Sequence, residues 1–181
     1  MARVPFRRRR GTIEATLDPG EADLLRGLCR QLSDLLDAGQ DPEIPGGADP
    51  ALERLFPRAY LDPTEEGAEA EWQRLVHGDL MDGRRRALAA MERTLDTTDP
   101  SAAPRTPRGP RGRLVVTLTD EEAEAWLAVL NDSRLTLGSR LEVTEDFDLA
   151  GLDPTDPETA PYALYWWLGL LEERLVAVLA H

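Results

Sequence analysis

The sequence predicts a mostly α-helical α+β domain, with about five helices and a small two-stranded sheet. Residues 12–17 alternate apolar and polar side chains, as a half-buried strand does, and residues 113–118 form a second predicted strand. Each segment runs directly into a capping signal, and leucines at helical spacing follow it. A chain of 181 residues can bury a core without disulfides or metals. We therefore expect 1–181 to form a single domain.

The first strand and helix follow each other closely. Ile13, Ala15 and Leu17 share one face of the strand, and Asp18 with Glu21 three residues later forms a capping signal. The helix then carries one apolar stripe at spacings of three and four, formed by Leu24, Leu25, Leu28, Leu32, Leu35 and Leu36. Gly39 and the proline-glycine steps that follow predict its end.

Two further helices complete the first half of the chain. A short helix begins at Asp49 and ends before Pro57, and a long helix runs from Thr64 to about Leu95. Its expected inner face consists of Trp72, Leu75, Val76, Leu80, Leu88, Met91 and Leu95. Gly78 and Gly83 each weaken a helix by about 1 kcal/mol relative to alanine, so we predict a bend or break between them.

Residues 97–112 combine four prolines with glycine, serine and arginine, which predicts a flexible linker. The second half then repeats the opening pattern: a strand at 113–118, a capping box at Thr119 and Glu122, and helices ending near Leu141 and at about 161–180. An offset of 101 residues aligns Leu17 with Leu118 and Glu21 with Glu122. Either a true structural repeat or the capping pattern alone explains these matches. In a true repeat the two strands would pair.

The charge is distributed unevenly. All 21 basic residues are arginine, against 34 acidic residues, for a net charge of −13. Residues 1–11 and 104–113 hold nine of these arginines and no acid, which leaves a net charge of −22 on the rest. Such a body repels nucleic acid, so direct DNA binding would depend on the two basic tracts.

The tracts have three interpretations. In the first, they are disordered parts of the basic N-terminal tail or strand (1–11) and of the linker. In the second they contact an acidic protein surface, and in the third they contact the phosphates of DNA or RNA. The candidate contact residues are Arg7, Arg8, Arg9, Arg10, Arg105, Arg108 and Arg111. Neither tract interleaves aromatic residues for base stacking, and there is no recognition-helix pattern. We therefore do not expect nucleic acid to be a partner of this chain on its own.

Motifs for catalysis are missing from the sequence. It has no phosphate-binding glycine loop, no nucleophile elbow and no metalloprotease helix. Its histidines are His77 and the terminal His181, and the acidic residues near Glu145 lack EF-hand spacing. We expect no enzyme activity, no cofactor and no bound metal.

Three polar residues on the fourth helix border an apolar face: Asn131, Asp132 and Arg134. Polar groups at such positions need partners. In one interpretation Arg134 bridges an acid on another helix, such as Glu172 or Glu173, and fixes the packing. In the other, the three residues form a polar hook for a partner protein.

The last helix has almost no polar side in its first half, which contains Tyr165, Trp166, Trp167 and Leu170. Such a helix should be buried all round. Tryptophan and tyrosine are enriched at binding hot spots, so these residues indicate either a homodimer or partner interface, or a fully internal core. We expect the chain to form a homodimer.

The single cysteine, Cys29, excludes an intramolecular disulfide. It is either a small buried apolar residue or a reactive thiol whose pKa Arg26 and Arg30 lower. No apolar run approaches the roughly 20 residues of a membrane span, and no secretory signal is evident. We expect a soluble, cytoplasmic protein without membrane contact.

Several segments together resemble a known family. They are Leu55-Phe56-Pro57 followed by Tyr60, the capped strand-helix 115–126, the run LNDSRLTLGSRLEV at 130–143, and 165–175. This combination is similar to an actinobacterial family of domains of unknown function that includes AosR-like oxidative-stress-responsive regulators, usually encoded near ClpS. The resemblance covers nearly the whole chain, and the segment from Asn131 to Leu135 is its most specific part.

The resemblance implies a non-enzymatic regulatory or adaptor protein that acts on transcription through protein contacts, with a sigma factor as a possible partner. AosR-like regulators sense redox state through two cysteines separated by one residue near the N-terminus. Residues 1–10 of this chain contain no cysteine, so that switch does not carry over. Two alternatives stay open: a direct DNA-binding regulator that uses the arginine tracts, and a structural homodimer module of unrelated role.

Overall fold

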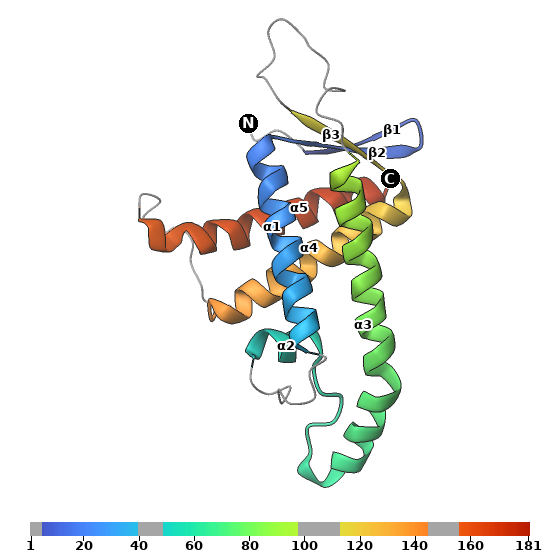
Figure 1. The fold of residues 1–181 in the computed structure, drawn as a ribbon, viewed down its shortest axis with the longest axis vertical. Coiled ribbons are helices and arrows are strands. Elements are labelled where there is room, and N and C mark those ends of the chain that lie inside the picture. Colours follow the sequence, from blue (N-terminus) through green and yellow to red (C-terminus); the bar gives the residue numbers. More distant parts are fainter. Residues whose placement is uncertain (1–4, 40–48, 98–112, 145–155) are drawn as a thin grey trace, which may run out of the picture.

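The fold is described by a computed structural model that covers residues 5–39, 49–97, 113–144 and 156–181 (Figure 1). In these residues the predicted fold class is confirmed, with five α-helices and a small antiparallel sheet. The elements in chain order are β1 (Phe6–Arg9), β2 (Thr12–Leu17), α1 (Pro19–Ala38), α2 (Pro50–Leu55), a 3₁₀ turn (Pro63–Glu65), α3 (Glu66–Asp96), β3 (Leu114–Leu118), α4 (Asp120–Arg140), a second 3₁₀ turn (Pro157–Thr159) and α5 (Ala160–Leu179). Most of the predicted linker lies outside the described residues.

The sheet has three strands in the order β1-β2-β3, so the prediction of two strands was one short. The two strands predicted to pair do so, with Ile13 opposite Leu118. The additional strand is the arginine-rich β1, which joins β2 through a turn where Arg10 and Gly11 have positive φ angles of 51° and 86°. Because charged side chains fill most of β1, only the buried Phe6 anchors it to the core, and the sequence carries no clear alternation there.

The pairing of β2 with β3 is centred on residues that the internal sequence match makes equivalent. Ala15 pairs with Val116, and the same two residues are equivalent under the offset of 101. A capping box closes both helix starts, formed by Asp18 with Glu21 and by Thr119 with Glu122. Antiparallel pairing centred on equivalent residues is the geometry expected when a repeated unit meets its copy. It favours the interpretation of the internal match as a structural repeat.

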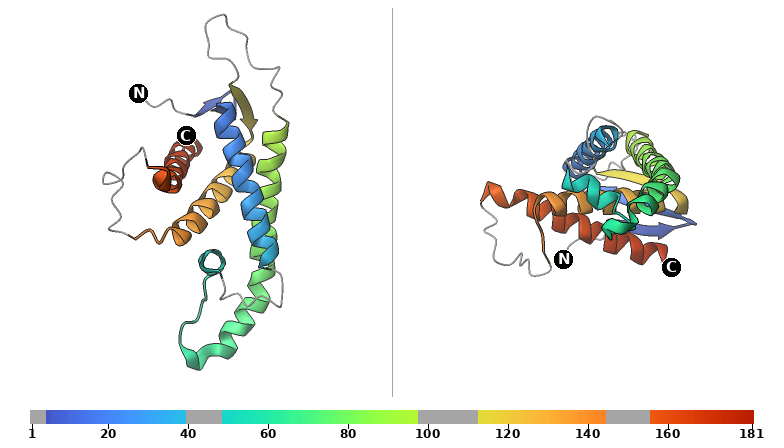
Figure 2. Two further views of the ribbon diagram at one scale, coloured as in Figure 1. Left: turned by 60° about the vertical axis from the view of Figure 1, so that its left-hand side comes forward. Right: turned by 90° about the horizontal axis from the view of Figure 1, so that it is seen from below.

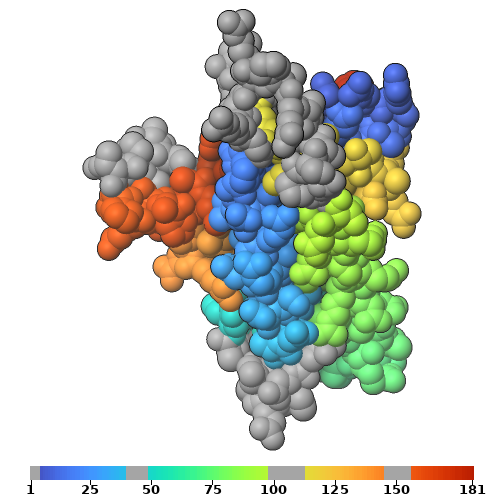
Figure 3. Space-filling model, turned by 45° about the horizontal axis from the view of Figure 1, so that its top comes forward, coloured from blue at the N-terminus to red at the C-terminus, as the bar shows by residue number. Residues whose placement is uncertain are grey.

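The helices pack below the sheet. α1 and α3 lie side by side, and α4 crosses them and packs against α3, α2 and α5 (Figures 1 and 2). Figure 3 shows α1 and α3 adjoining on one face of the molecule. The core lies where these elements meet, and its largest fully buried side chains are Trp126, Phe6, Ile13, Leu17, Leu25, Leu36, Leu55, Met91, Leu95, Leu118, Leu130 and Leu168.

The long helix α3 is continuous over 31 residues, so the predicted break between Gly78 and Gly83 was wrong. Both glycines face open space, and the helix between them is held by the buried side chain of Met81. The first half of α3 extends beyond the other helices (Figure 1). For this reason Leu75, expected on the inner face, is 60% exposed, whereas Leu88 and Met91 in the second half are buried.

Candidate functional site

The segment from Asn131 to Arg134 on α4 sends its polar side chains in three directions. Asp132 points inward to α3, where its Oδ2 lies 3.2 Å from Nε of Arg84. The same guanidinium donates a hydrogen bond of 2.8 Å to the carbonyl of Leu55 and stacks at 4.7 Å over the ring of Phe56. Burial raises the pKa of Asp132 above its ordinary value of 3.8, and the positive charge of Arg84 opposes this rise.

Arg134 points to α5 and confirms the predicted bridge. Its Nη1 donates to Oε2 of Glu172 at 3.2 Å, and its Nη2 donates to the hydroxyl of Tyr165 at 3.3 Å. The guanidinium also lies 5.0 Å from the centroid of the Tyr165 ring. Burial raises the pKa of Glu172, and the charge of Arg134 acts against it. Asp132 and Arg134 therefore join α4 to two different helices.

Asn131 points outward and lines a groove between α4 and α5 with a volume of about 710 Å³. The groove is lined from α4 by Glu124, Leu127, Ala128, Asn131 and Arg134, and from α5 by Gly169, Glu172, Glu173 and Val176. Its lining surface is mostly apolar and includes three carboxylates. Of the three residues weighed as a polar hook, Asn131 alone is exposed to a possible partner.

The aromatic cluster of α5 divides between core and surface. Trp166 is 56% exposed, which contradicts the expectation that this helix is buried all round. Trp167 is partly buried against the hydrophobic core, and Tyr165 and Leu170 are half-buried. The helix lies across one side of α4, so part of its circumference faces solvent (Figure 2). Trp166 is thus the member of the cluster available for contact with another molecule.

The arginines of β1 are ordered and paired with acids. Arg7 and Arg9 contact Oε2 and Oε1 of Glu14 at 2.6 and 3.2 Å, and Arg8 contacts Asp120 at 2.8 Å. The hydrogen bond from Arg7 is the main cause that lowers the pKa of Glu14. Arg10 lies exposed in the turn after β1. The other candidate contacts, Arg105, Arg108 and Arg111, lie outside the described residues.

Cys29 lies in the core on α1, with 1% of its surface exposed. Burial raises the pKa of its thiol to about 12, and the nearby carboxylate of Glu92 adds to the effect more than Arg30 offsets it. The thiolate is the reactive form of cysteine. The hypothesis of a reactive thiol required exposure and a lowered pKa, and this environment provides neither.

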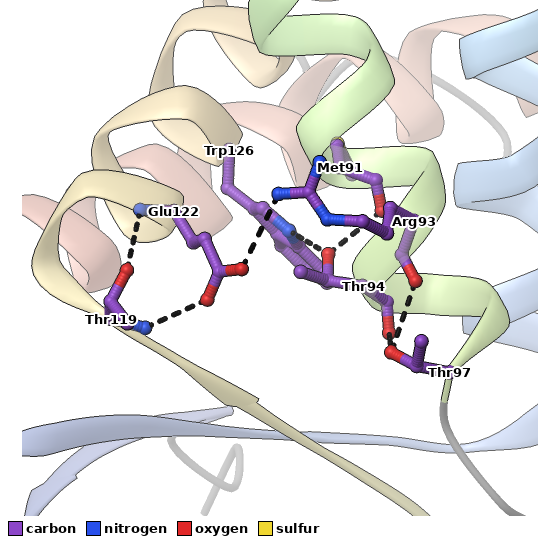
Figure 4. A network of polar contacts seen from close by, with 7 residues as sticks. All are labelled: Met91, Arg93, Thr94, Thr97, Thr119, Glu122 and Trp126. Carbon is purple, nitrogen blue, oxygen red and sulfur yellow. Dashed lines mark hydrogen bonds and ion pairs between the residues drawn. The ribbon is translucent and has the colours of Figure 1, made fainter.

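Sequence reasoning missed Arg84 and Thr94, which connect α3 to α4. The indole Nε1 of the fully buried Trp126 donates to Oγ1 of Thr94 at 2.8 Å, and that hydroxyl donates to the carbonyl of Met91 (Figure 4). A signal was present: both residues fall at spacings of three and four among the buried apolar residues Met81, Leu88, Met91 and Leu95. A polar residue inside an apolar stripe must find a buried partner.

The described residues contain no group of three or more histidine, cysteine, aspartate or glutamate side chains that could hold a metal ion. In the same part of the chain, no helix is both long and apolar enough to span a bilayer. The site is a set of ion pairs between helices, next to an open groove.

Fold and site together define a small α+β domain in which the polar residues Asp132 and Arg134 form ion pairs between helices. The chain belongs to a family described as a domain of unknown function, DUF2017, whose pattern matches residues 3–179. It is 31% identical to proteins named oxidative stress regulator AosR from Mycobacterium tuberculosis and Mycobacterium bovis, over 91% of this chain and 81% of theirs. No solved structure matches. The resemblance inferred from the residues is thereby confirmed.

Proposed function

We propose that this chain is a non-enzymatic regulatory protein of the oxidative stress response that acts on transcription through protein contacts. The observation that carries the proposal is the extent of the similarity to the AosR regulators, which covers 91% of the chain and includes the segment at Asn131. The surroundings of that segment support it, since Asp132 and Arg134 are engaged in packing and Asn131 borders an open groove. We also propose that the protein acts in the cytoplasm.

A sigma factor is the partner that we propose. The net charge of −13 suits a partner with a basic surface better than it suits DNA. The redox signal would have to enter through that partner or another molecule, because Cys29 is buried with a raised pKa.

The test uses cells that lack the gene for this chain. We expect them to be more sensitive to peroxide and to lose induction of stress transcripts, with both restored by the wild-type gene. Binding of the purified chain to purified sigma factors of the same cells, measured by calorimetry, should identify one partner. Unchanged peroxide survival and transcription in the deletion strain would contradict the proposed function.

Direct DNA binding is the second candidate. It is favoured by the exposure of Arg7 and Arg9, whose side chains are 64% and 56% exposed on one hairpin. Their pairing with Glu14 weakens it, because binding phosphate would then compete with an existing ion pair. A gel-shift experiment at low salt tests it, and retention should fall steeply as salt rises. The third alternative, a homodimer module, is favoured by the exposure of Trp166.

A further inference from the structure

The groove between α4 and α5 is lined mostly by apolar surface and by three carboxylates. Leu127, Ala128 and Val176 supply apolar surface to its lining, and Gly169 adds no side chain there. Glu172 is paired with Arg134, so these two charges offset each other. Glu124 and Glu173 form no ion pair with any described residue. The groove therefore presents apolar surface together with two carboxylates that no described residue pairs.

A large aromatic side chain extends this surface along α5. Trp166, Gly169, Glu173 and Val176 follow one another at spacings of three and four, which places them on one side of the helix. Trp166 is 56% exposed and Val176 is 49% exposed. An exposed tryptophan beside an apolar groove is the residue type that most often anchors a protein contact.

We propose that this groove binds a basic amphipathic helix of a partner protein; this deepens the proposed function and rests on it. The lining residues span 124–134 of α4, a length of about 15 Å at the rise of an α-helix, which matches roughly three turns of a docked helix. Such a helix places apolar residues at i, i+3, i+4 and i+7 against the apolar lining. Lysine or arginine on its flanks would face Glu124 and Glu173.

Charge argues against a second copy of this chain as the occupant. In a symmetric dimer the same patch meets itself, so Glu124 and Glu173 would lie close to the same carboxylates of the partner copy. Two chains that each carry a net charge of −13 also repel one another. A basic helix meets neither obstacle, and electrostatic attraction would speed its association.

The test measures binding of a labelled peptide to the full chain by fluorescence polarisation. The probe is a helical leucine-lysine peptide of about 14 residues with leucines at i, i+3, i+4 and i+7, and the control peptide has the same composition in scrambled order. We expect the patterned peptide to bind more tightly than the scrambled one. The double variant E124R/E173R should weaken binding by at least about fivefold.

A matched variant controls for net charge. D79R/D82R makes the same change in charge at two exposed positions of α3, away from the groove, and should bind the peptide like the wild type. Equal binding of the two peptides, or equal losses in the two variants, would overturn the proposal. Self-association of the wild type that the E124R/E173R substitutions alter, seen by light scattering, would also overturn it by showing that a second copy occupies the groove.

Failure of this proposal can be separated from failure of the proposed function. If the deletion strain resists peroxide normally, the proposed function fails, whatever the peptide does. If the strain is sensitive and E124R/E173R restores resistance as fully as the wild type, the function stands and the groove proposal fails. Restoration by D79R/D82R but not by E124R/E173R supports both.

Discussion

Two polar residues inside the apolar stripe of α3 determine which face of α4 it meets. Thr94 accepts a hydrogen bond from Trp126, and Arg84 forms an ion pair with Asp132. Apolar contacts alone tolerate small shifts between helices, whereas a buried donor must keep its acceptor. These pairs therefore fix the register of α3 against α4 at two positions.

Substitution of Thr94 by valine tests the first of these contacts. The T94V variant keeps the shape of the side chain but leaves the buried indole N–H of Trp126 without its acceptor. We expect a loss of about 1–3 kcal/mol in the free energy of unfolding, measured by urea titration. The matched variant T97V removes a hydroxyl at the exposed end of the same helix and should change it by less than about 0.5 kcal/mol. Equal effects would show that the Trp126 hydrogen bond is unimportant.

A second prediction concerns the pH dependence of Asp132. Because burial raises its pKa above 3.8, the folded protein retains a proton that the unfolded chain has already lost. The contribution of this group to stability is then fully present below pH 3.8 and declines as pH rises through the folded pKa. We expect the free energy of unfolding of the wild type, minus that of D132N, to fall as pH rises above about 4.

The same measurement in the absence of Arg84 provides the control. Without the guanidinium that opposes the effect of burial, the difference between R84M and R84M/D132N should fall over a wider pH range. A difference that rises with pH would show that attraction to Arg84 dominates over burial. Urea titrations of the four proteins across this range supply the data.

At this scale the sequence predicted the pairing of Arg134 with an acid of α5, because an arginine bordering an apolar face has few other possible partners. It could not assign a partner to Asp132. Three consecutive arginines occur at 84–86, and charge alone does not distinguish them. Only the position of Arg84 within the stripe of α3 separates it from Arg85 and Arg86.

At the scale of elements, the crossing of α4 and α5 depends on close approach at Gly138. A methyl group added there would lie 2.8 Å from Cε2 of Tyr165, a ring that Arg134 also contacts. At Gly169, on the other helix, an added methyl would lie 3.4 Å from Nε of Arg134, near ordinary contact. Of these two positions, Gly138 is therefore the one that has no room for a methyl group.

Alanine scanning of two glycines tests this crossing. Alanine at an exposed helical position is favoured over glycine by about 1 kcal/mol, so G78A, where the added methyl meets open space, should stabilise the protein by about 0.5–1 kcal/mol. G138A gains the same helical preference but must displace the Tyr165 ring, which costs about 1–3 kcal/mol. We expect no gain or a net loss in thermal unfolding. Equal stabilisation by both variants would show that a methyl group at position 138 fits between α4 and the Tyr165 ring.

The capped strand-helix units were the elements that the sequence predicted best, since the capping boxes and the apolar spacing of the helices agree there. β1 was harder to recognise because its stability depends on ion pairs to Glu14 and Asp120, which adjoin it only in the folded chain. The exposed first half of α3 shows the opposite case. Its apolar stripe predicts an inner face, although none of the other described α-helices extends far enough to cover it.

For the molecule as a whole, the division into an acidic body and basic tracts changes on folding. Three arginines of the first tract pair with acids of the body, so part of the basic charge is neutralised in place. The uncompensated charge that remains along the α4–α5 groove is negative. Apolar exposure on α5 adjoins that groove, at Trp166 and Val176. The negative charge of the groove and the exposed apolar side chains of α5 thus lie next to each other.

Separate substitution of the two adjacent tryptophans tests this assignment. Trp166 is 56% exposed, so W166A should change the free energy of unfolding by less than about 0.5 kcal/mol. Trp167 packs against the core, so W167A should cost about 2–4 kcal/mol because it leaves a partial cavity. Since W166A keeps its fold, any loss of peptide binding in that variant reports on the surface itself.

Light scattering on the same samples separates the two surface roles of Trp166. We expect the wild type and W166A to show the mass of a single chain, 20.1 kDa, because symmetric pairing through this face would oppose like charges. A doubled mass that W166A returns to the single-chain value would instead establish a homodimer through α5. Equal destabilisation by W166A and W167A would place both rings in the core, and Trp166 would then be unavailable to any partner.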